Sequence, residues 1–398
     1  MKRWLAVACV MAFAVFELGS FSASPALAQG PSFEELAQRV VSTSAKVKAG
    51  DVVVIYGGKH TIPLMEALAI EVNKAGGMAQ MFLRYSDRVY RSFLVDVAER
   101  YLEQPRTYFA EWLKQVDVWI ILPGVEDPRA AFADVPAGRF AKANNAFQVL
   151  DEMLNASGVR EVFIGYPTKE VAAINRIDFA TLEKMHWDAV NADYDQISAQ
   201  GKQLKQLLQG AKVVKVTSPS GTNLTFSVGD RPVFVNDGIV TEEEAKGKLF
   251  LTRNASLPGG TVFVAPPEIS ANGKVVVPRT LCRFGPLTGV SFEFQNGKLA
   301  NFKAEKGGEC FEDIMGPYTG PKDMFGWFEI GLNPALKVVE DPGDYRPGNA
   351  AGMVWISIGN NEMGGGTNKT QGGFGFPIVK ATVEIDGKVV VKDGRLVF

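Results

Sequence analysis

Glu329 and Glu362 are the residues of this sequence whose type and setting best suit catalysis. Glu329 interrupts the apolar run WFEIGL, and a carboxylate in such a run needs a partner or a role because burying an unpaired charge is costly. If burial raises the pKa of one carboxyl above that of the other, the two can act as acid and base. One interpretation is therefore a catalytic pair, with Asn360, Asn361 and Asn368 orienting a polar substrate. The alternative for Glu362 is an exposed turn residue.

Glu329 also has alternatives to a catalytic role. It can form an ion pair with Arg279 or Arg283, which lie in the same half of the chain. A cluster of carboxylate and amide oxygens can also hold a single Ca²⁺ or Mg²⁺ without any imidazole. A divalent cation at Glu329 is therefore the one cofactor that these residues suggest, and otherwise we expect none.

Histidine is scarce, and this limits the metal chemistry open to the chain. There are 2 His residues, His60 and His186, so a His-rich metal site requires the fold to bring both together. We expect His60 to be a surface or helix-cap residue and His186, next to Trp187 on a helix, to be structural.

The first residues have the pattern of a secretory signal peptide. A basic start, MKRW, precedes the apolar run LAVACVMAFAVF and the small-residue segment SPALAQG, which predicts cleavage after Ala28. The apolar run is shorter than the roughly 20 residues that a membrane span needs. We therefore expect residues 1–28 to be removed, leaving a periplasmic or secreted protein with no membrane span.

Cys282 and Cys310 would then lie in an oxidising compartment. An even pair of cysteines in an exported protein favours a disulfide. Two buried thiols remain the alternative, because spacing in the sequence cannot establish that the sulfurs meet.

Composition argues against nucleic acid as a partner. The formal net charge is -2, whereas phosphate binding needs clustered Lys and Arg. We expect a small molecule or a peptide as the partner instead. The 398 residues are enough for two domains.

The first half of the chain predicts a parallel sheet. Strand-like runs alternate with stretches of helical spacing, as in a doubly wound α/β domain. The predicted strands are 51–58, 78–85, 117–124 and 161–167, and the predicted helical segments are 62–77, 91–115, 140–157 and 179–210.

The second half predicts antiparallel sheet. Short alternating runs follow one another, and QNGK and IDGK are hairpin turn signals. One short helix is expected near 309–315. The fold class is therefore α/β, with an N-terminal doubly wound domain at 29–200 and a C-terminal α+β domain rich in antiparallel strands at 201–398.

Four motifs in fixed order resemble those of the aminopeptidase T type family of metallo-aminopeptidases. They are SPSGTNLTFSV, LPGGTVFVAPPEISANGKVVV, FEIGLNPAL and VWISIGNNEMGGGTNKTQGGFGFPI. The resemblance covers nearly all of the mature chain. It implies a homodimer and a pair of bridged divalent metals in the C-terminal domain, which activate a shared water for peptide hydrolysis.

The family's ligand positions are mostly altered in this sequence. Where the family's motifs have Glu, His, His and Asp, the sequence has Thr261, Trp355, Gly373 and Gly375, and it keeps one glutamate, Glu329. Where the family often has a catalytic Tyr, it has Glu362. The ring-cleaving iron dioxygenases that share this fold need His and Asp at the closing positions as well.

We therefore expect a non-peptidase that binds or processes a small molecule in the former cleft, lined by Trp355, Phe374 and Phe376. The alternative for Trp355 is that it fills the vacated volume and leaves no pocket. A second hypothesis is a divergent metal-dependent aminopeptidase or amidohydrolase with an altered carboxylate set, drawn from Glu268, Glu312, Asp313, Asp323 and Glu362. If Glu268 is not a ligand, we expect a surface acid at a strand end.

Overall fold

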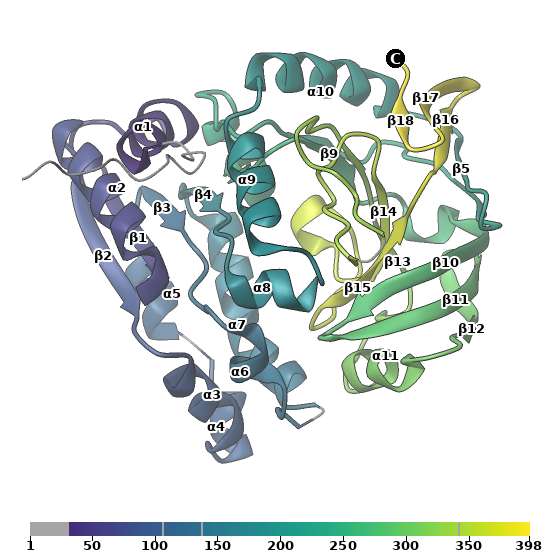
Figure 1. The fold of residues 1–398 in the computed structure, drawn as a ribbon, viewed down its shortest axis with the longest axis horizontal. Coiled ribbons are helices and arrows are strands. Elements are labelled where there is room, and N and C mark those ends of the chain that lie inside the picture. The colour runs from purple at the N-terminus through teal and green to yellow at the C-terminus, as the bar shows by residue number, and fades with distance from the viewer. Residues whose placement is uncertain (1–31, 106, 137, 341–342) are drawn as a thin grey trace, which may run out of the picture.

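Three β-sheets organise the part of the chain that the structure describes, one parallel and two antiparallel (Figure 1). The structure is a computed structural model, and it describes residues 32–105, 107–136, 138–340 and 343–398. The predicted signal peptide lies outside these residues. The predicted fold class, an α/β unit followed by an antiparallel-rich unit, is confirmed.

The first unit is built on a five-stranded parallel sheet in the order β2-β1-β3-β4-β8. Val53 and Ile55 of β1 are buried on one face and Val54 on the other, because helices cover both faces of a parallel sheet. The strands are β1 (Val52–Gly58), β2 (Met78–Arg84), β3 (Val118–Ile121), β4 (Arg160–Ile164) and β8 (Asn254–Leu257).

Ten α-helices accompany this sheet within the described ranges. They are α1 (Phe33–Arg39), α2 (Ile62–Lys74), α3 (Asp87–Val95), α4 (Glu99–Leu102), α5 (Thr107–Leu113), α6 (Pro128–Phe132), α7 (Arg139–Ala156), α8 (Lys169–Ile174), α9 (Phe179–Val190) and α10 (Tyr194–Leu208). The helical stretch predicted at 91–115 is thus divided among three short helices.

The single helix predicted at 179–210 is two helices. Helix α9 ends at Val190, and the side chain of Asp193 then accepts a hydrogen bond from the backbone of Gln196 at the start of α10. An aspartate in this position stabilises a new helix N-terminus by satisfying a free N–H group. Its short polar side chain therefore favours a break that apolar spacing alone does not reveal.

Strand β8 crosses the predicted domain boundary. It lies beyond residue 200, yet it pairs in parallel with β4 and completes the first sheet. The chain therefore passes into the second unit, returns to the first for β8, and leaves again.

The second unit contains two antiparallel sheets that pack over one core. One sheet has the order β12-β11-β10-β6-β5-β16-β17-β18 and the other β15-β14-β13-β9-β7. Aromatic rings fill much of the space between them; the Phe226 ring lies 5.1 Å from that of Phe325 and 4.9 Å from that of Phe328.

The bounds of these elements follow. The eight-stranded sheet consists of β5 (Val214–Thr217), β6 (Asn223–Phe226), β10 (Asn272–Cys282), β11 (Gly285–Gln295), β12 (Lys298–Lys303), β16 (Thr382–Ile385), β17 (Lys388–Lys392) and β18 (Arg395–Leu396). The five-stranded sheet consists of β7 (Val233–Asn236), β9 (Thr261–Val264), β13 (Phe325–Gly331), β14 (Val354–Gly359) and β15 (Gly373–Ile378). The predicted short helix is α11 (Gly308–Met315).

Both predicted hairpin turns are present. Asn296 and Gly297 join β11 to β12 with φ values of 49° and 77°, and Asp386 and Gly387 join β16 to β17 with 46° and 88°. Two successive positive φ values match the twist of the flanking strands, and Asn-Gly and Asp-Gly tolerate them best.

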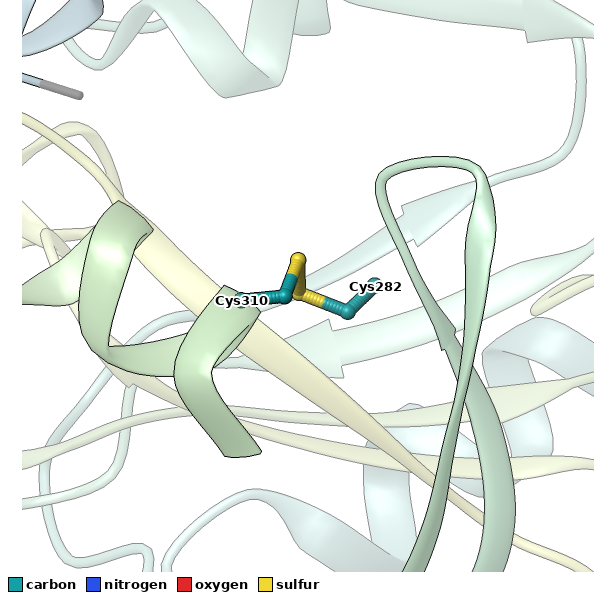
Figure 2. Close-up of a disulfide and its surroundings, with 2 residues drawn as sticks. All are labelled: Cys282 and Cys310. Carbon is teal, nitrogen blue, oxygen red and sulfur yellow. A yellow bond between two sulfur atoms is a disulfide. The ribbon is translucent and has the colours of Figure 1, made fainter. Parts of the chain in front are cut away.

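A disulfide joins Cys282 to Cys310, as predicted. Figure 2 shows it linking the end of β10 to helix α11. It therefore fixes the tip of the β10–β11 hairpin against the helix. No helix in the described ranges is long and apolar enough to cross a membrane.

Candidate functional site

The outer face of the five-stranded sheet carries the residues singled out by their sequence motifs. Side chains alternate along each strand, so Phe328 and Ile330 point into the core while Glu329 points away from it. Glu329 is paired with Trp355 of β14 on one side and with Phe263 of β9 on the other. Directly paired residues share a face, so these three side chains lie together.

The neighbouring strands add the other positions to this face. Thr261 precedes Phe263 by two residues and pairs with Gly331. On β15, Gly375 pairs with Ser357 and Gly373 pairs with Gly359. The register therefore brings Thr261, Glu329, Trp355, Gly373 and Gly375 onto one face of the sheet, which we call the outer face.

The indole of Trp355 occupies much of this face. It packs against a buried cluster that includes Ala189, and Met185 packs against the same cluster; both residues lie on α9 of the first unit. A Cβ atom placed on Gly375 would lie 2.9 Å from Cε3 and 3.0 Å from Cζ3 of the indole, so the ring rests directly on that glycine. Trp355 thus fills space between the sheet and α9. This corresponds to the alternative in which its side chain fills the vacated volume.

Polar groups on the outer face lack partners among the described residues. Trp355 Nε1 and Ser357 Oγ are buried and form no hydrogen bond. A Cβ on Gly348 would lie 3.4 Å from Trp355 Nε1 and 3.8 Å from Glu329 Oε2, so the indole and the carboxylate flank the same glycine. Burial raises the pKa of Glu329 above its ordinary value, because the charged form loses hydration.

Neither arginine that the sequence suggested pairs with Glu329. Arg279 Nε lies 2.6 Å from Asp344 Oδ2, and the Arg283 guanidinium lies 5.5 Å from the centre of the Phe140 ring. The proposed ion pair is therefore wrong.

Glu362 lies far from Glu329 along the sheet. Glu329 is paired with Trp355 near the start of β14, whereas Glu362 is exposed in the turn that follows the end of that strand. The strand residues between Trp355 and Gly359 alone span roughly 13 Å at about 3.3 Å per residue. The two carboxylates are not brought together, and the alternative of an exposed turn residue describes Glu362.

Two of the three asparagines predicted to orient a substrate instead hold the loop after β14, and the third, Asn361, donates to Glu268. Asn360 donates its amide to the carbonyl of Thr370 at 2.8 Å. Asn368, which is 2% exposed, donates to the carbonyls of Phe325 and Gly359 at 2.9 and 3.1 Å. The side-chain amides of Asn360 and Asn368 thus donate to backbone carbonyls.

Phe374 and Phe376 do not line a pocket with Trp355. They pair with Ile358 and Ile356, and the pleat turns all four side chains toward the core, on the face opposite to Trp355. Phe376 is 0% exposed. The predicted grouping with Trp355 is wrong, because the sequence does not indicate which residues of β15 face outward.

Glu268 is buried, in contrast to the expected surface acid. Its carboxylate accepts hydrogen bonds from Arg231 at 2.8 Å, from the Asn361 side chain at 2.9 Å and from the backbone N–H of Thr367 at 2.7 Å. Burial alone would raise its pKa, but these donors outweigh that effect and lower it. Glu268 thus ties the 361–368 loop to the end of β9.

The histidines stay apart from the outer face. His186 Nε2 lies 2.9 Å from the carbonyl oxygen of Gly165, and burial lowers the pKa of its ring to about 4. His60 follows β1 and has its ring edge against Tyr166. Within the described ranges, no three side chains of His, Cys, Asp or Glu are grouped so that they could hold a metal ion.

A cavity lies where the two units meet. It has a volume of about 310 Å³ and is bordered by α6 and α7 of the first unit and by the β10–β11 turn and the α11 region of the second. The cavity extends toward the start of β15. Tyr318 lines it, and a Cβ on Gly372, the residue before β15, would lie 2.9 Å from the Tyr318 hydroxyl. Its lining residues include Phe132, Phe140, Asn144, Arg283, Phe284 and Ile314.

Comparison with known proteins identifies the family. A family model described as thermophilic metalloprotease (M29) matches residues 30–322, which is most of the chain. The chain belongs to the M29 family. The predicted membership of the aminopeptidase T group is therefore confirmed. In this M29 protein, residues 345–398 also match a model described as 2,5-dihydroxypyridine 5,6-dioxygenase.

Solved structures show the same fold. Wild-type AmpT from Thermus thermophilus is similar with a TM-score of 0.70 and 17% identity, over 92% of this M29 chain and 99% of AmpT. The 2,5-dihydroxypyridine dioxygenase from Pseudomonas putida KT2440 has a TM-score of 0.59 and 15% identity, over 92% and 96% of the two chains. No curated protein sequence matches the chain.

Proposed function

We propose that this M29 protein is exported, does not hydrolyse peptides by the two-metal chemistry that the resemblance implies, and binds a small molecule where its two units meet. The observation that carries the proposal is the side-chain set on the outer face. The paired strands gather the five relevant positions, and one of them, Glu329, is a carboxylate.

The chemistry of this set does not fit a pair of divalent ions. Two bridged ions need several carboxylates or imidazoles to hold and neutralise them. Thr261 offers a neutral hydroxyl, Gly373 and Gly375 offer no side chain, and the indole N–H of Trp355 is a donor only. Glu329 is left as a single anionic ligand.

The alternative carboxylate set gains no support from the placement of its members. Glu268 is already neutralised by Arg231, and Asp323 forms an ion pair with Lys298 at 3.5 Å. Glu362 is exposed beyond β14. Since no three His, Cys, Asp or Glu side chains are grouped for metal binding in the part of the chain that the structure describes, a metal-dependent peptidase built on these acids has no assembled site in its favour.

Two further features support the rest of the proposal. The N-terminal segment has the pattern of a signal peptide, and a disulfide suits an oxidising compartment. The cavity of about 310 Å³ is at the lower end of the range of about 300–1,000 Å³ found for small-molecule sites. It lies at an interface between units, where such sites are common.

Metal content tests the central claim. The mature protein, purified without chelator, is analysed for zinc, cobalt, iron and manganese by plasma mass spectrometry, beside the variants Glu329→Gln and Glu362→Gln. We expect far less than one ion per chain and no difference among the three proteins. Stoichiometric metal that disappears in Glu329→Gln and persists in Glu362→Gln would contradict the proposal.

Peptidase activity provides the second measurement. A panel of aminoacyl-nitroanilides is assayed with and without added Zn²⁺ or Co²⁺ and with a chelator. We expect no turnover that the chelator abolishes. Chelator-sensitive turnover lost in Glu329→Gln would mean that the family chemistry persists with an unforeseen ligand set.

A further inference from the structure

The cavity between the two units combines aromatic walls with a single arginine at its surface. Phe132 and Phe140 line it from the first unit, and Phe284 and Ile314 line it from the second. Rings arranged in this way suit a flat apolar group, because aromatic pairs prefer offset or edge-to-face contact. Among the charged residues that line the cavity is Arg283.

Arg283 has a backbone conformation that disfavours a side chain. It is the first of the two turn residues between β10 and β11, and its φ is 52°. This left-handed conformation costs a residue with a Cβ atom about 1 kcal/mol or more relative to glycine. A left-handed residue that also lines a cavity motivates the hypothesis that its side chain has a role there.

Among the described residues, none forms an ion pair with the Arg283 side chain. Its guanidinium lies 5.5 Å from the centre of the Phe140 ring, at the border between the units. A guanidinium that lies over a ring in this way keeps its N–H fork free for a carboxylate, which it matches in a planar, two-bond arrangement. Arg283 therefore presents an unused anion-binding group next to an apolar wall.

The disulfide holds two walls of the cavity together. Cys282 immediately precedes Arg283 and Phe284, and Cys310 lies on α11, which carries Ile314 (Figure 2). The covalent link keeps the hairpin tip and the helix in a fixed relation without a ligand. A prearranged site loses less entropy on binding.

From these observations we propose that the cavity binds a small aromatic molecule with one carboxylate. The ring lies among Phe132, Phe140 and Phe284, and the carboxylate is held by Arg283. Asp313, an exposed acid that also lines the cavity, repels a dianion more strongly than a monoanion, which favours a carboxylate over a phosphate dianion. This inference deepens the proposed function, on whose small-molecule binding it rests.

Calorimetric titration of the mature protein tests the ligand class. The probes are 3-phenylpropionate, its neutral amide and phenyl phosphate. We expect 3-phenylpropionate to bind about tenfold or more tightly than the amide, because a charge-assisted hydrogen bond pair is lost, and more tightly than phenyl phosphate. Equal binding of acid and amide, tighter binding of phenyl phosphate, or no binding of any probe would overturn the assignment.

Three arginine variants separate recognition from folding. Arg283→Gly and Arg283→Gln should each weaken 3-phenylpropionate about tenfold or more while leaving the amide nearly unchanged. Because glycine relaxes the turn, Arg283→Gly should retain or raise the melting temperature. Arg129→Gln, an exposed arginine on α6 outside the cavity, should bind as the wild type. Unchanged 3-phenylpropionate affinity in both Arg283 variants would overturn the proposal.

The two proposals fail in different ways. Protein without metal or peptidase activity that binds no probe retains the loss of family chemistry and overturns the aromatic carboxylate site. Protein that binds 3-phenylpropionate through Arg283 and also shows chelator-sensitive peptidase activity supports the site and overturns the proposed function.

Discussion

At the scale of single residues, a buried histidine makes the fold sensitive to acid. His186 is 8% exposed, and burial lowers its pKa from 6.5 to about 4. In the unfolded chain the ring takes up a proton near pH 6.5, whereas in the native state it stays neutral until about pH 4. Below pH 6.5 the unfolded state therefore binds more protons, and the free energy of unfolding falls as the pH falls.

The variant His186→Gln tests this effect. Wild type should lose about 3 kcal/mol of unfolding free energy through this residue between pH 6.5 and pH 4, and the variant should lose less by that amount. Denaturant unfolding at several pH values measures the difference. His60→Gln is the control, with a smaller change because His60 is only half-buried. Parallel pH profiles for wild type and His186→Gln would contradict the prediction.

A second buried group acts between weakly acidic and neutral pH. Burial raises the pKa of Glu161 from 4.5 to about 7, although a hydrogen bond from Asn254 opposes the shift. The native state thus keeps a proton that the unfolded chain releases above pH 4.5, so stability through this residue falls as the pH rises toward 7.

Glu161→Gln keeps the acceptor for Asn254 and removes the titration. At pH 8 the variant should exceed the wild type in unfolding free energy by up to about 3 kcal/mol, and near pH 4 the two should be equal. Thermal or urea unfolding at both pH values measures the difference. A variant that is less stable than wild type at pH 8 would contradict the raised pKa of Glu161.

The kinds of side chain available to a site could be judged from the sequence better than the contacts that those side chains form. The pairing of two cysteines followed from their number and the expected compartment, and the shortage of histidine is a fact of composition. The partners of Glu268 could not be predicted, because Arg231 and Asn361 are distant in the sequence and meet it through strand and loop packing. The expected ion pair of Glu329 failed for the same reason.

At the scale of elements, local signals located the strands and helices but did not assign their faces. The Asn-Gly and Asp-Gly turns and the β-branched run of β1 depend on a few neighbouring residues, so they could be predicted from the sequence. The break at Asp193 was missed because one capping side chain decides it. The side of the sheet to which Phe374 points depends on register with β14, which short apolar runs do not specify.

The disulfide gives a prediction at this scale. The double variant Cys282→Ala/Cys310→Ala releases a closure of 28 residues and should lose about 3–4 kcal/mol of unfolding free energy. It should also bind 3-phenylpropionate more weakly, because the hairpin tip and α11 are no longer fixed together. Reductant should lower the stability of the wild type and leave the double variant unchanged. Equal stability of both proteins without reductant would contradict the prediction.

At the scale of the whole molecule, the two units are not consecutive pieces of chain. The sequence predicted a boundary at residue 200 because strand–helix alternation stops there. Strand β8 lies beyond that boundary and covers the edge of β4. An isolated four-residue strand carries no sign of which sheet it joins, so this crossing could not be predicted.

A fragment of residues 29–210 should therefore not fold cooperatively. It lacks β8 and leaves the backbone groups of β4 unpaired at an exposed edge, which favours aggregation. A peptide covering residues 250–260 should restore a cooperative thermal transition by adding the missing strand, and a scrambled peptide should not. A fragment that melts cooperatively without the peptide would show that the first sheet is stable with four strands.

The contact between Trp355 and Gly375 constrains the order of mutations along which this surface can change. No side chain fits at Gly375 while the indole rests on it, since even a Cβ would lie 2.9 Å from Cε3. A Cβ at Gly373 would meet the carbonyl oxygen of Ile358 at 2.2 Å, so that position also requires backbone movement first. Acidic or imidazole residues can be introduced there only after Trp355 is replaced and β15 shifts. Any mutational path from the present surface to a metal-binding one therefore passes through variants that pack poorly. Selection for stability alone would preserve the present surface.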